Sequence, residues 1–230
     1  MLKKIFLTII SLFFLVVLSV LAKYEWDFRK TYPLVNQRIN QGAPQPDLSL
    51  GKRIYHVRAG CVDCHGVDLT GAQVMNNFPM VAIFGANLTP YNLGDWSDED
   101  LARAIRFGIH KSGRSLRFMP SFDFTDLSQG DLVSLIAYLR SQPAVKQESK
   151  EVSIGPVAKV LSALGQMPVL FPGKIIDPHK PFISKPMEAK TREFGEYLAK
   201  TCTGCHGHEF RGGPIPGGAP DWPPAASHCV

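Results

Sequence analysis

The pattern Cys-x-x-Cys-His occurs twice in this chain, at residues 61–65 and again at residues 202–206. With five Cys and seven His among 230 residues, chance would produce it only about 0.003 times, so two copies are not accidental. On one helical turn, the two sulfurs can form thioethers with the vinyl groups on one edge of a porphyrin, while the imidazole reaches the iron. The pattern is therefore typical of covalent haem c attachment.

Both copies are predicted to hold haem c. The predicted thioether positions are Cys61, Cys64, Cys202 and Cys205, and the predicted iron ligands are His65 and His206. Zinc binding or thioredoxin-like dithiol chemistry is the competing interpretation of two cysteine pairs. Zinc-binding pairs usually lie within roughly twenty residues of each other, whereas well over a hundred residues separate these two. The spacing favours two separate haem sites.

The chain is basic, with a formal net charge of +5 and a pI near 9.0. Such a charge is compatible with binding to nucleic acid or to an anionic membrane. However, Lys3 and Lys4 belong to the N-terminal segment, and the propionates of the haems would offset much of the remaining excess. No run of Lys and Arg exceeds two residues. Nucleic acid is therefore not an expected partner.

Residues 5–22 form an apolar run of eighteen residues that follows Lys3 and Lys4. As a helix it would be about 27 Å long, close to the roughly 30 Å of a bilayer core. The lysines favour a cytoplasmic N-terminus, and Tyr24 and Trp26 suit the outer interface. A signal peptide cleaved after residues 20–22 is the alternative. The body is expected at the bacterial inner membrane facing the periplasm, or periplasmic or secreted if the segment is cleaved.

Periodic apolar positions predict helices over 50–57, 101–108, 132–139 and 194–198. Ser97 and Ser128 stand directly ahead of acidic first turns, as helix N-caps do. The predicted organisation is a membrane anchor or signal segment at 1–22, a stalk at 23–48, a first domain at 49–143, a proline-rich linker at 144–186 and a partial second domain at 187–230.

Met119 is the predicted sixth ligand of the first haem iron. A thioether in that position raises the reduction potential. Pro120 stiffens the loop, and the helix capped by Ser128 follows. Met75 and Met80 are rivals, but neither stands in a proline-stiffened loop just ahead of a strong helix. A core methionine that fills an irregular gap is the alternative role for Met119.

Several segments resemble class I cytochrome c domains, namely residues 61–66, 86–90, 96–100, 119–120 and 137–140. More narrowly, they resemble the domains of membrane-anchored multihaem cytochromes such as the cytochrome subunits of bacterial alcohol and gluconate dehydrogenases. The resemblance implies an all-α cytochrome c fold with one complete and one partial domain behind an N-terminal transmembrane helix. It also implies that His65 and Met119 are axial ligands and that Asn87 has a supporting role near the porphyrin.

Residues 143–186 contain seven of the chain's eighteen prolines, too many for a long regular element. One short helix is predicted inside this linker, beginning at Gly155 and Pro156 and ending at Gly165. Its apolar stripe consists of Val157, Val160, Leu161 and Leu164. The stripe is expected to pack on a neighbouring domain rather than on a membrane surface.

The second repeat lacks a methionine after His206. The sixth position of its iron is expected to be empty, filled by water, or taken by His208 or His228, although His208 is close to His206 and His228 is close to a mobile end. Cys229 is expected to belong to an unrelated tail. The favoured explanation is a second domain truncated from a longer reading frame, and the alternative is a haem that is open by design.

These features predict an electron carrier rather than an enzyme. The expected partners are a periplasmic dehydrogenase as donor, a quinone-linked or oxidase-linked acceptor, and the membrane. The alternative is a dihaem peroxidase, or a gas or redox sensor, that uses an open second haem. A peroxidase needs a polar distal pocket with positioned acid and base groups, whereas the residues after His206 are mostly glycine and proline.

Overall fold

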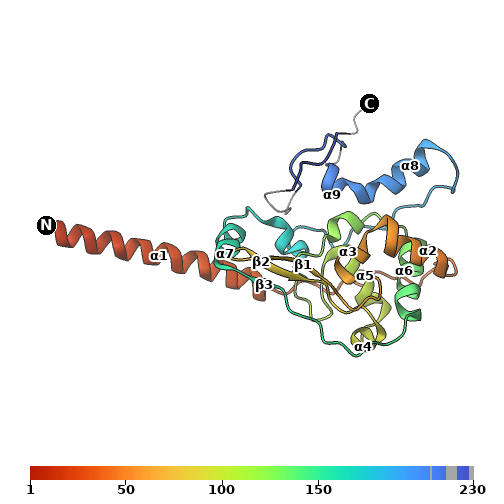
Figure 1. Ribbon diagram of the computed structural model, residues 1–230, viewed down its shortest axis with the longest axis horizontal. Coiled ribbons are helices and arrows are strands. Elements are labelled where there is room, and N and C mark those ends of the chain that lie inside the picture. The colour runs from red at the N-terminus through yellow and green to blue at the C-terminus, as the bar shows by residue number, and fades with distance from the viewer. Residues whose placement is uncertain (208, 216–221, 228–230) are drawn as a thin grey trace.

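The computed structural model describes residues 1–207, 209–215 and 222–227, and it consists of a helical head from which one long helix projects (Figure 1). That helix, α1 (Leu2–Arg29), is the one helix among the described residues that is long and apolar enough to cross a membrane. It is about 42 Å long, so roughly two turns extend beyond a hydrocarbon core of about 30 Å. The sequence predicted the end of this segment at Ala22, but the helix continues to Arg29.

Residues 30–47, which the sequence assigned to a stalk, lie against the head. Glu99 accepts hydrogen bonds from the backbone N–H groups of Gln37 (2.7 Å) and Ile39 (2.8 Å). The Ile39 side chain is fully buried in the main core. This segment is therefore part of the packed head and not a free spacer.

The first part of the head is built from short helices around the first motif. They are α2 (Leu48–Arg53), the π-helical turn η1 (Ile54–Arg58), α3 (Cys61–His65), α4 (Pro90–Leu93), α5 (Asp98–Phe107), the 3-10 turn η2 (Ser121–Phe124) and α6 (Gln129–Ser141). Ser97 and Asp100 form a reciprocal capping box at the start of α5, and Ser128 caps α6 as predicted. Local capping thus determines where both predicted helices begin.

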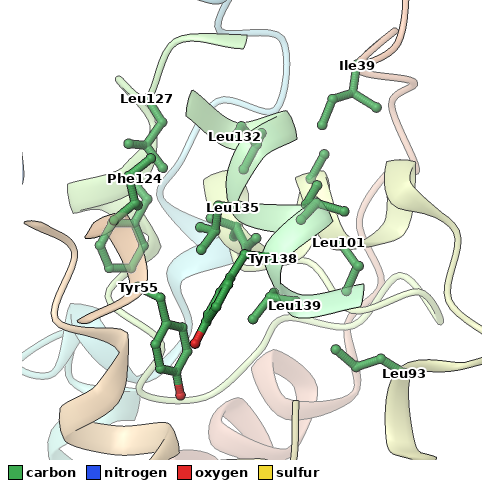
Figure 2. Close-up of a cluster of buried hydrophobic side chains, with 14 of the residues drawn as sticks. Ile39, Tyr55, Leu93, Leu101, Phe124, Leu127, Leu132, Leu135, Tyr138 and Leu139 are labelled. Atoms are coloured by element: carbon green, nitrogen blue, oxygen red, sulfur yellow. The ribbon is translucent and has the colours of Figure 1, made fainter. Parts of the chain in front are cut away.

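The main hydrophobic core lies where α2 and η1 cross α6. Figure 2 shows Tyr55 beside Tyr138, with Phe124 and Leu127 towards one side of Leu135. The ring centroids of Tyr55 and Tyr138 are 5.7 Å apart. Gly51 permits the crossing, because a Cβ at this position would lie 2.1 Å from the carbonyl oxygen of Ser134.

The head also contains a small antiparallel sheet in the order β1-β2-β3, so the all-α prediction was incomplete. Its strands are β1 (Gln73–Asn77), β2 (Val81–Phe84) and β3 (Ser153–Ile154). Asn77 pairs with Val81 across the hairpin, and Val81 also pairs with Ile154 of the linker. The hairpin has little signature in the sequence, since four apolar residues in a row do not distinguish a strand from a helix.

The linker carries α7 (Pro156–Ala163) and the 3-10 turns η3 (Pro168–Leu170) and η4 (Pro172–Lys174). The prediction that its apolar stripe packs on a neighbouring domain is wrong for Val157, Val160 and Leu164, which are exposed. The smaller Ala158 and Ser162 are buried instead. A helical period indicates that a helix has an apolar face, but it does not identify what that face meets.

The second motif lies in a short helical segment along one side of the head (Figure 1). It comprises α8 (Arg192–Ala199), the 3-10 turn η5 (Lys200–Cys202) and α9 (Thr203–His206).

Replacing Gly51 by alanine is expected to destabilise the head by about 1–3 kcal/mol, because the new methyl group would overlap the backbone of α6. Gly195→Ala is the matched control, since Gly195 is also helical and its Cβ position has no neighbour within 4 Å. The control should stabilise by about 0.5–1 kcal/mol. Urea unfolding measures both changes, and equal midpoints would contradict the close crossing.

Candidate haem site

The first motif forms the one-turn helix α3, whose ends are set by two glycines. Gly60 precedes it with φ 59° and Gly66 follows it with φ 77°. Gly85, just after β2, packs against the turn, because a Cβ there would lie 1.8 Å from the carbonyl oxygen of Cys64. The residue that follows the unpredicted strand β2 therefore packs directly on the attachment turn.

The His65 imidazole is oriented by a backbone carbonyl. Its Nδ1 lies 2.8 Å from the carbonyl oxygen of Ala86, which can only accept, so Nδ1 carries the proton and Nε2 keeps its lone pair. Burial lowers the pKa of His65, while the bond to Ala86 acts in the opposite direction. A neutral imidazole that donates one N–H to a carbonyl is the usual state of a metal-binding histidine.

The cysteines of the first motif do not resemble reactive or zinc-binding thiolates. Burial raises the pKa of the Cys61 thiol to about 12 and also raises the pKa of Cys64. Reactive Cys-x-x-Cys pairs instead have lowered pKa values. Within the described ranges, no three His, Cys, Asp or Glu side chains are grouped so as to hold a metal ion. The zinc and dithiol interpretations find no support in this geometry.

A largely apolar pocket brings Met119 together with His65. The pocket is lined by Tyr55, Ala59, Cys61, His65, Leu88, Ile105, Met119, Phe124, Leu127, Leu135 and Leu139. The rival residues Met75 and Met80 instead pack against the cluster around Val81 and Ile83 in the sheet. Of these three methionines, Met119 is the one that lines the pocket of His65.

Asn87 is fully buried and ties two loops together. Its side-chain amide donates to the carbonyl oxygens of Val145 (3.0 Å) and Gln147 (2.8 Å), while its own Oδ1 accepts from the backbone N–H of Thr89 (2.8 Å). Because Asn87 directly follows Ala86, these bonds hold in place the carbonyl that orients His65.

The second motif repeats the backbone path of the first. Gly207 has φ 75° where Gly66 has 77°. Gly71 N–H donates to the carbonyl of His65 at 2.8 Å, and Gly212 N–H donates to that of His206 at 3.0 Å.

The orientation of the histidine is also repeated. Nδ1 of His206 lies 3.0 Å from the carbonyl oxygen of Ala226, as that of His65 lies 2.8 Å from Ala86. The two repeats thus place their histidines in the same way.

The surroundings of the second motif differ from those of the first. Cys202 and Cys205 are exposed, whereas Cys61 and Cys64 are half-buried. Both η5 and α9 contact η2, the turn that follows Met119 and Pro120. At this contact Gly204 lies close to Asp123, since a Cβ at position 204 would lie 2.2 Å from Oδ2 and the carboxylate would have to move. Burial raises the pKa of Asp123 to about 7, although the N–H of Gly204 favours its charged form.

A buried carboxylate, Asp131, anchors α8 to the head. It accepts hydrogen bonds from the hydroxyl of Tyr197 (2.5 Å), from Lys185 (3.0 Å) and from Arg58. The Tyr197 hydroxyl in turn accepts from the N–H of Ser128 at 3.0 Å. Burial opposes ionisation of Asp131, but these hydrogen bonds and cations outweigh it and hold its pKa below the usual range.

The sequence did not identify this group as part of the site. In the sequence, Asp131 falls in the acidic first turn after Ser128 and Tyr197 in the predicted helix over 194–198, and neither pattern predicts a contact between them. The available signal was a tyrosine hydroxyl on the apolar face of α8, which needs a partner when it is buried. His208, His228 and Cys229, which the sequence raised as ligands or as a tail, lie outside the described residues.

Parts of this chain are similar to known cytochromes, which supports a haem site at the first motif. Residues 46–139 match the family model described as Cytochrome C oxidase, cbb3-type, subunit III. The gluconate 2-dehydrogenase cytochrome c subunit of Pantoea cypripedii is 34% identical over 110 residues, covering 44% of this chain and 25% of the relative. The fructose dehydrogenase cytochrome subunit of Gluconobacter japonicus is 30% identical over 109 residues, covering 44% of this chain and 22% of the relative.

A longer similarity extends outside residues 46–139. The cytochrome c subunit of alcohol dehydrogenase (quinone) from Gluconobacter oxydans is 28% identical over 178 residues, covering 71% of this chain and 36% of the relative. The chain thus spans little more than a third, or less, of the length of these relatives. The family model and these relatives are of cytochrome type, which agrees with the prediction of covalent haem attachment at residues 61–65.

Replacing Tyr197 by phenylalanine is expected to weaken the attachment of α8 by about 1–3 kcal/mol, because Asp131 and the N–H of Ser128 each lose a buried partner. Amide hydrogen exchange should accelerate in residues 192–206 and not in α5. Tyr91→Phe is the matched control, since Tyr91 donates to Glu148 at 2.8 Å on the surface. Identical exchange in the two variants would argue against an anchoring role.

Proposed function

We propose that this chain is a membrane-anchored dihaem cytochrome that relays electrons from a dehydrogenase to the respiratory chain. One observation carries the proposal: Cys61, His65 and Met119 line the same largely apolar pocket. A neutral imidazole and a thioether are the donors that a haem c iron takes, and a cysteine thiol is the group that links the porphyrin to the chain. The residues present therefore fit this cofactor.

Each residue of the first site has a separate task. Cys61 and Cys64 would hold the porphyrin edge, and His65 would bind the iron through Nε2. Its hydrogen bond to Ala86 keeps that nitrogen unprotonated and increases its basicity. Met119 would supply its thioether sulfur as a second ligand to the iron. When bound, haem supplies an iron that accepts and returns one electron.

The apolar lining of the pocket supports electron transfer over substrate chemistry. The side chains of Leu88, Ile105, Leu127 and Leu135 exclude water and offer no acid or base to a bound peroxide. Their low polarity also favours the reduced, less charged state of the iron, which acts on the potential in the same direction as a methionine ligand.

The second motif would hold a second haem through Cys202, Cys205 and His206. Its support is the repeated backbone path and the repeated histidine-to-carbonyl bond. Because α9 packs on η2, the second attachment turn lies against the element that follows Met119. This contact would place the residues that hold the second haem next to the loop that carries Met119.

The donor and the location follow from the relatives and from α1. Relatives named as cytochrome subunits of gluconate, alcohol and fructose dehydrogenases support a dehydrogenase donor. A quinone-linked or oxidase-linked protein would accept the electrons. Helix α1 would be retained as an anchor in the bacterial inner membrane. The head would lie in the periplasm, because covalent haem attachment occurs outside the cytoplasm.

Met119→Leu is expected to remove the sixth ligand of the first haem. The midpoint potential should fall by a fraction of the roughly 0.8 V that axial ligands span, and the methionine-to-iron absorption band should disappear. A spectroscopic redox titration measures both effects. Met75→Leu is the matched control, since Met75 is also half-buried but packs against the sheet. A normal spectrum in Met119→Leu would refute this ligand.

The double substitution Cys202→Ser and Cys205→Ser is expected to halve the haem content. The remaining haem should keep its methionine-type spectrum, because the first pocket contains no residue from the second motif. Haem per polypeptide is measured by the pyridine haemochrome method on protein matured in a periplasm. A single haem in the unaltered chain would contradict the dihaem proposal.

A further inference from the structure

Helix α7 and its C-cap residue expose three large apolar side chains, while two small side chains of the helix are buried. Val157, Val160 and Leu164 are 40%, 41% and 60% exposed, whereas Ala158 and Ser162 are buried. The three exposed residues follow one another at helical spacing and form a continuous stripe. Contiguous exposed apolar surface of this kind marks a site of contact with a partner or a membrane.

The buried side of α7 lies against the outer end of α1. The two helices are in contact, and Nζ of Lys159 lies 5.3 Å from the centre of the Tyr24 ring. Tyr24 follows the apolar run of residues 5–22 by two positions, about 3 Å along the helix axis. Figure 1 shows α7 at the end of the head from which α1 projects. Helix α7 is therefore level with the point where α1 leaves the hydrocarbon.

Further contacts hold the linker that carries α7 against the outer end of α1. Asp27 is buried and pairs with Lys23 at 2.5 Å and with Lys174 of η4 at 2.7 Å. The Tyr24 ring packs against Phe171, with centroids 6.1 Å apart. The depth of α7 is thus set by α1.

Charge around this junction fits an anionic lipid surface. The basic side chains there are Lys23, Arg29, Lys30, Arg117, Lys159 and Lys174, against the acidic Glu25 and Asp27. Trp26 is exposed on the same stretch of α1. Tryptophan and basic residues are the side chains that membrane interfaces favour.

We propose that α7 is an interfacial helix whose Val157, Val160 and Leu164 stripe enters the outer surface of the membrane that α1 crosses. The proposal rests on α1 being retained as an anchor. With α1 and α7 both in contact with lipid, the head has two attachments to the membrane, which oppose its tilting relative to the bilayer. The haem pocket would then face a fixed direction relative to the bilayer.

Photocrosslinking of the full-length, haem-loaded protein tests this contact. Val160→p-benzoyl-phenylalanine is irradiated in nanodiscs of phosphatidylethanolamine and phosphatidylglycerol, and lipid adducts are identified by mass spectrometry. The control is the same replacement at Val57, which is the same residue type and is 75% exposed, against 41% for Val160. Val57 lies in η1, directly after α2, which Figure 1 places at the end of the head away from α1. Lipid adducts should be several-fold more abundant at position 160 than at position 57.

The same experiment in native membranes shows whether a protein, rather than lipid, contacts the α7 stripe. Adducts with a protein at position 160 instead of lipid, equal lipid labelling at both positions, or no lipid adducts at all would each overturn the proposal. Intact mass and haem absorbance are recorded on the same samples. A chain that lacks residues 1–22 overturns the anchor and this proposal together, whereas a retained α1 without lipid adducts overturns this proposal alone.

Discussion

The hydrogen bond between Nδ1 of His65 and the carbonyl oxygen of Ala86 connects the attachment turn to the rest of the head. It determines which ring nitrogen is protonated, and it depends on the loop at residues 85–89 being held by Asn87. Gly85, in the same loop, lies against the Cys64 carbonyl. The position of one imidazole therefore depends on the hairpin, on the loop and on residues 145–147 together. The corresponding bond from His206 to Ala226 indicates that this arrangement is the shared element of the two repeats.

The two repeats differ in what surrounds this shared element. The first is enclosed by α2, α5 and α6, and its pocket is apolar. The second is attached to the outside of the first by polar groups, chiefly the carboxylate of Asp131 with Tyr197 and two cations. A buried carboxylate is tolerated only when such partners replace water. In this chain, apolar side chains enclose the first pocket, and polar groups attach the second repeat to the first.

Much of the first site could be predicted from local sequence. The motif identified Cys61, Cys64 and His65 as candidates, and the caps at Ser97 and Ser128 marked real helix starts, because these features depend on neighbours a few positions away. The pairing of β1 with β2 was missed, since Gln73–Asn77 does not alternate clearly between apolar and polar residues. The environment of α7 was predicted wrongly, and the role of Asp131 was not foreseen, because both depend on contacts between segments far apart in the chain.

The network around Asp131 has a consequence for the order in which the protein can assemble. Its members come from residues 58, 128, 131, 185 and 197, so it cannot close until the last of these is present. The groups that line the first pocket all lie between Tyr55 and Leu139. In a chain that folds from its N-terminus, the first compartment can therefore be complete before α8 is in place. The order of residues along the chain therefore allows the first pocket to form before the Asp131 network.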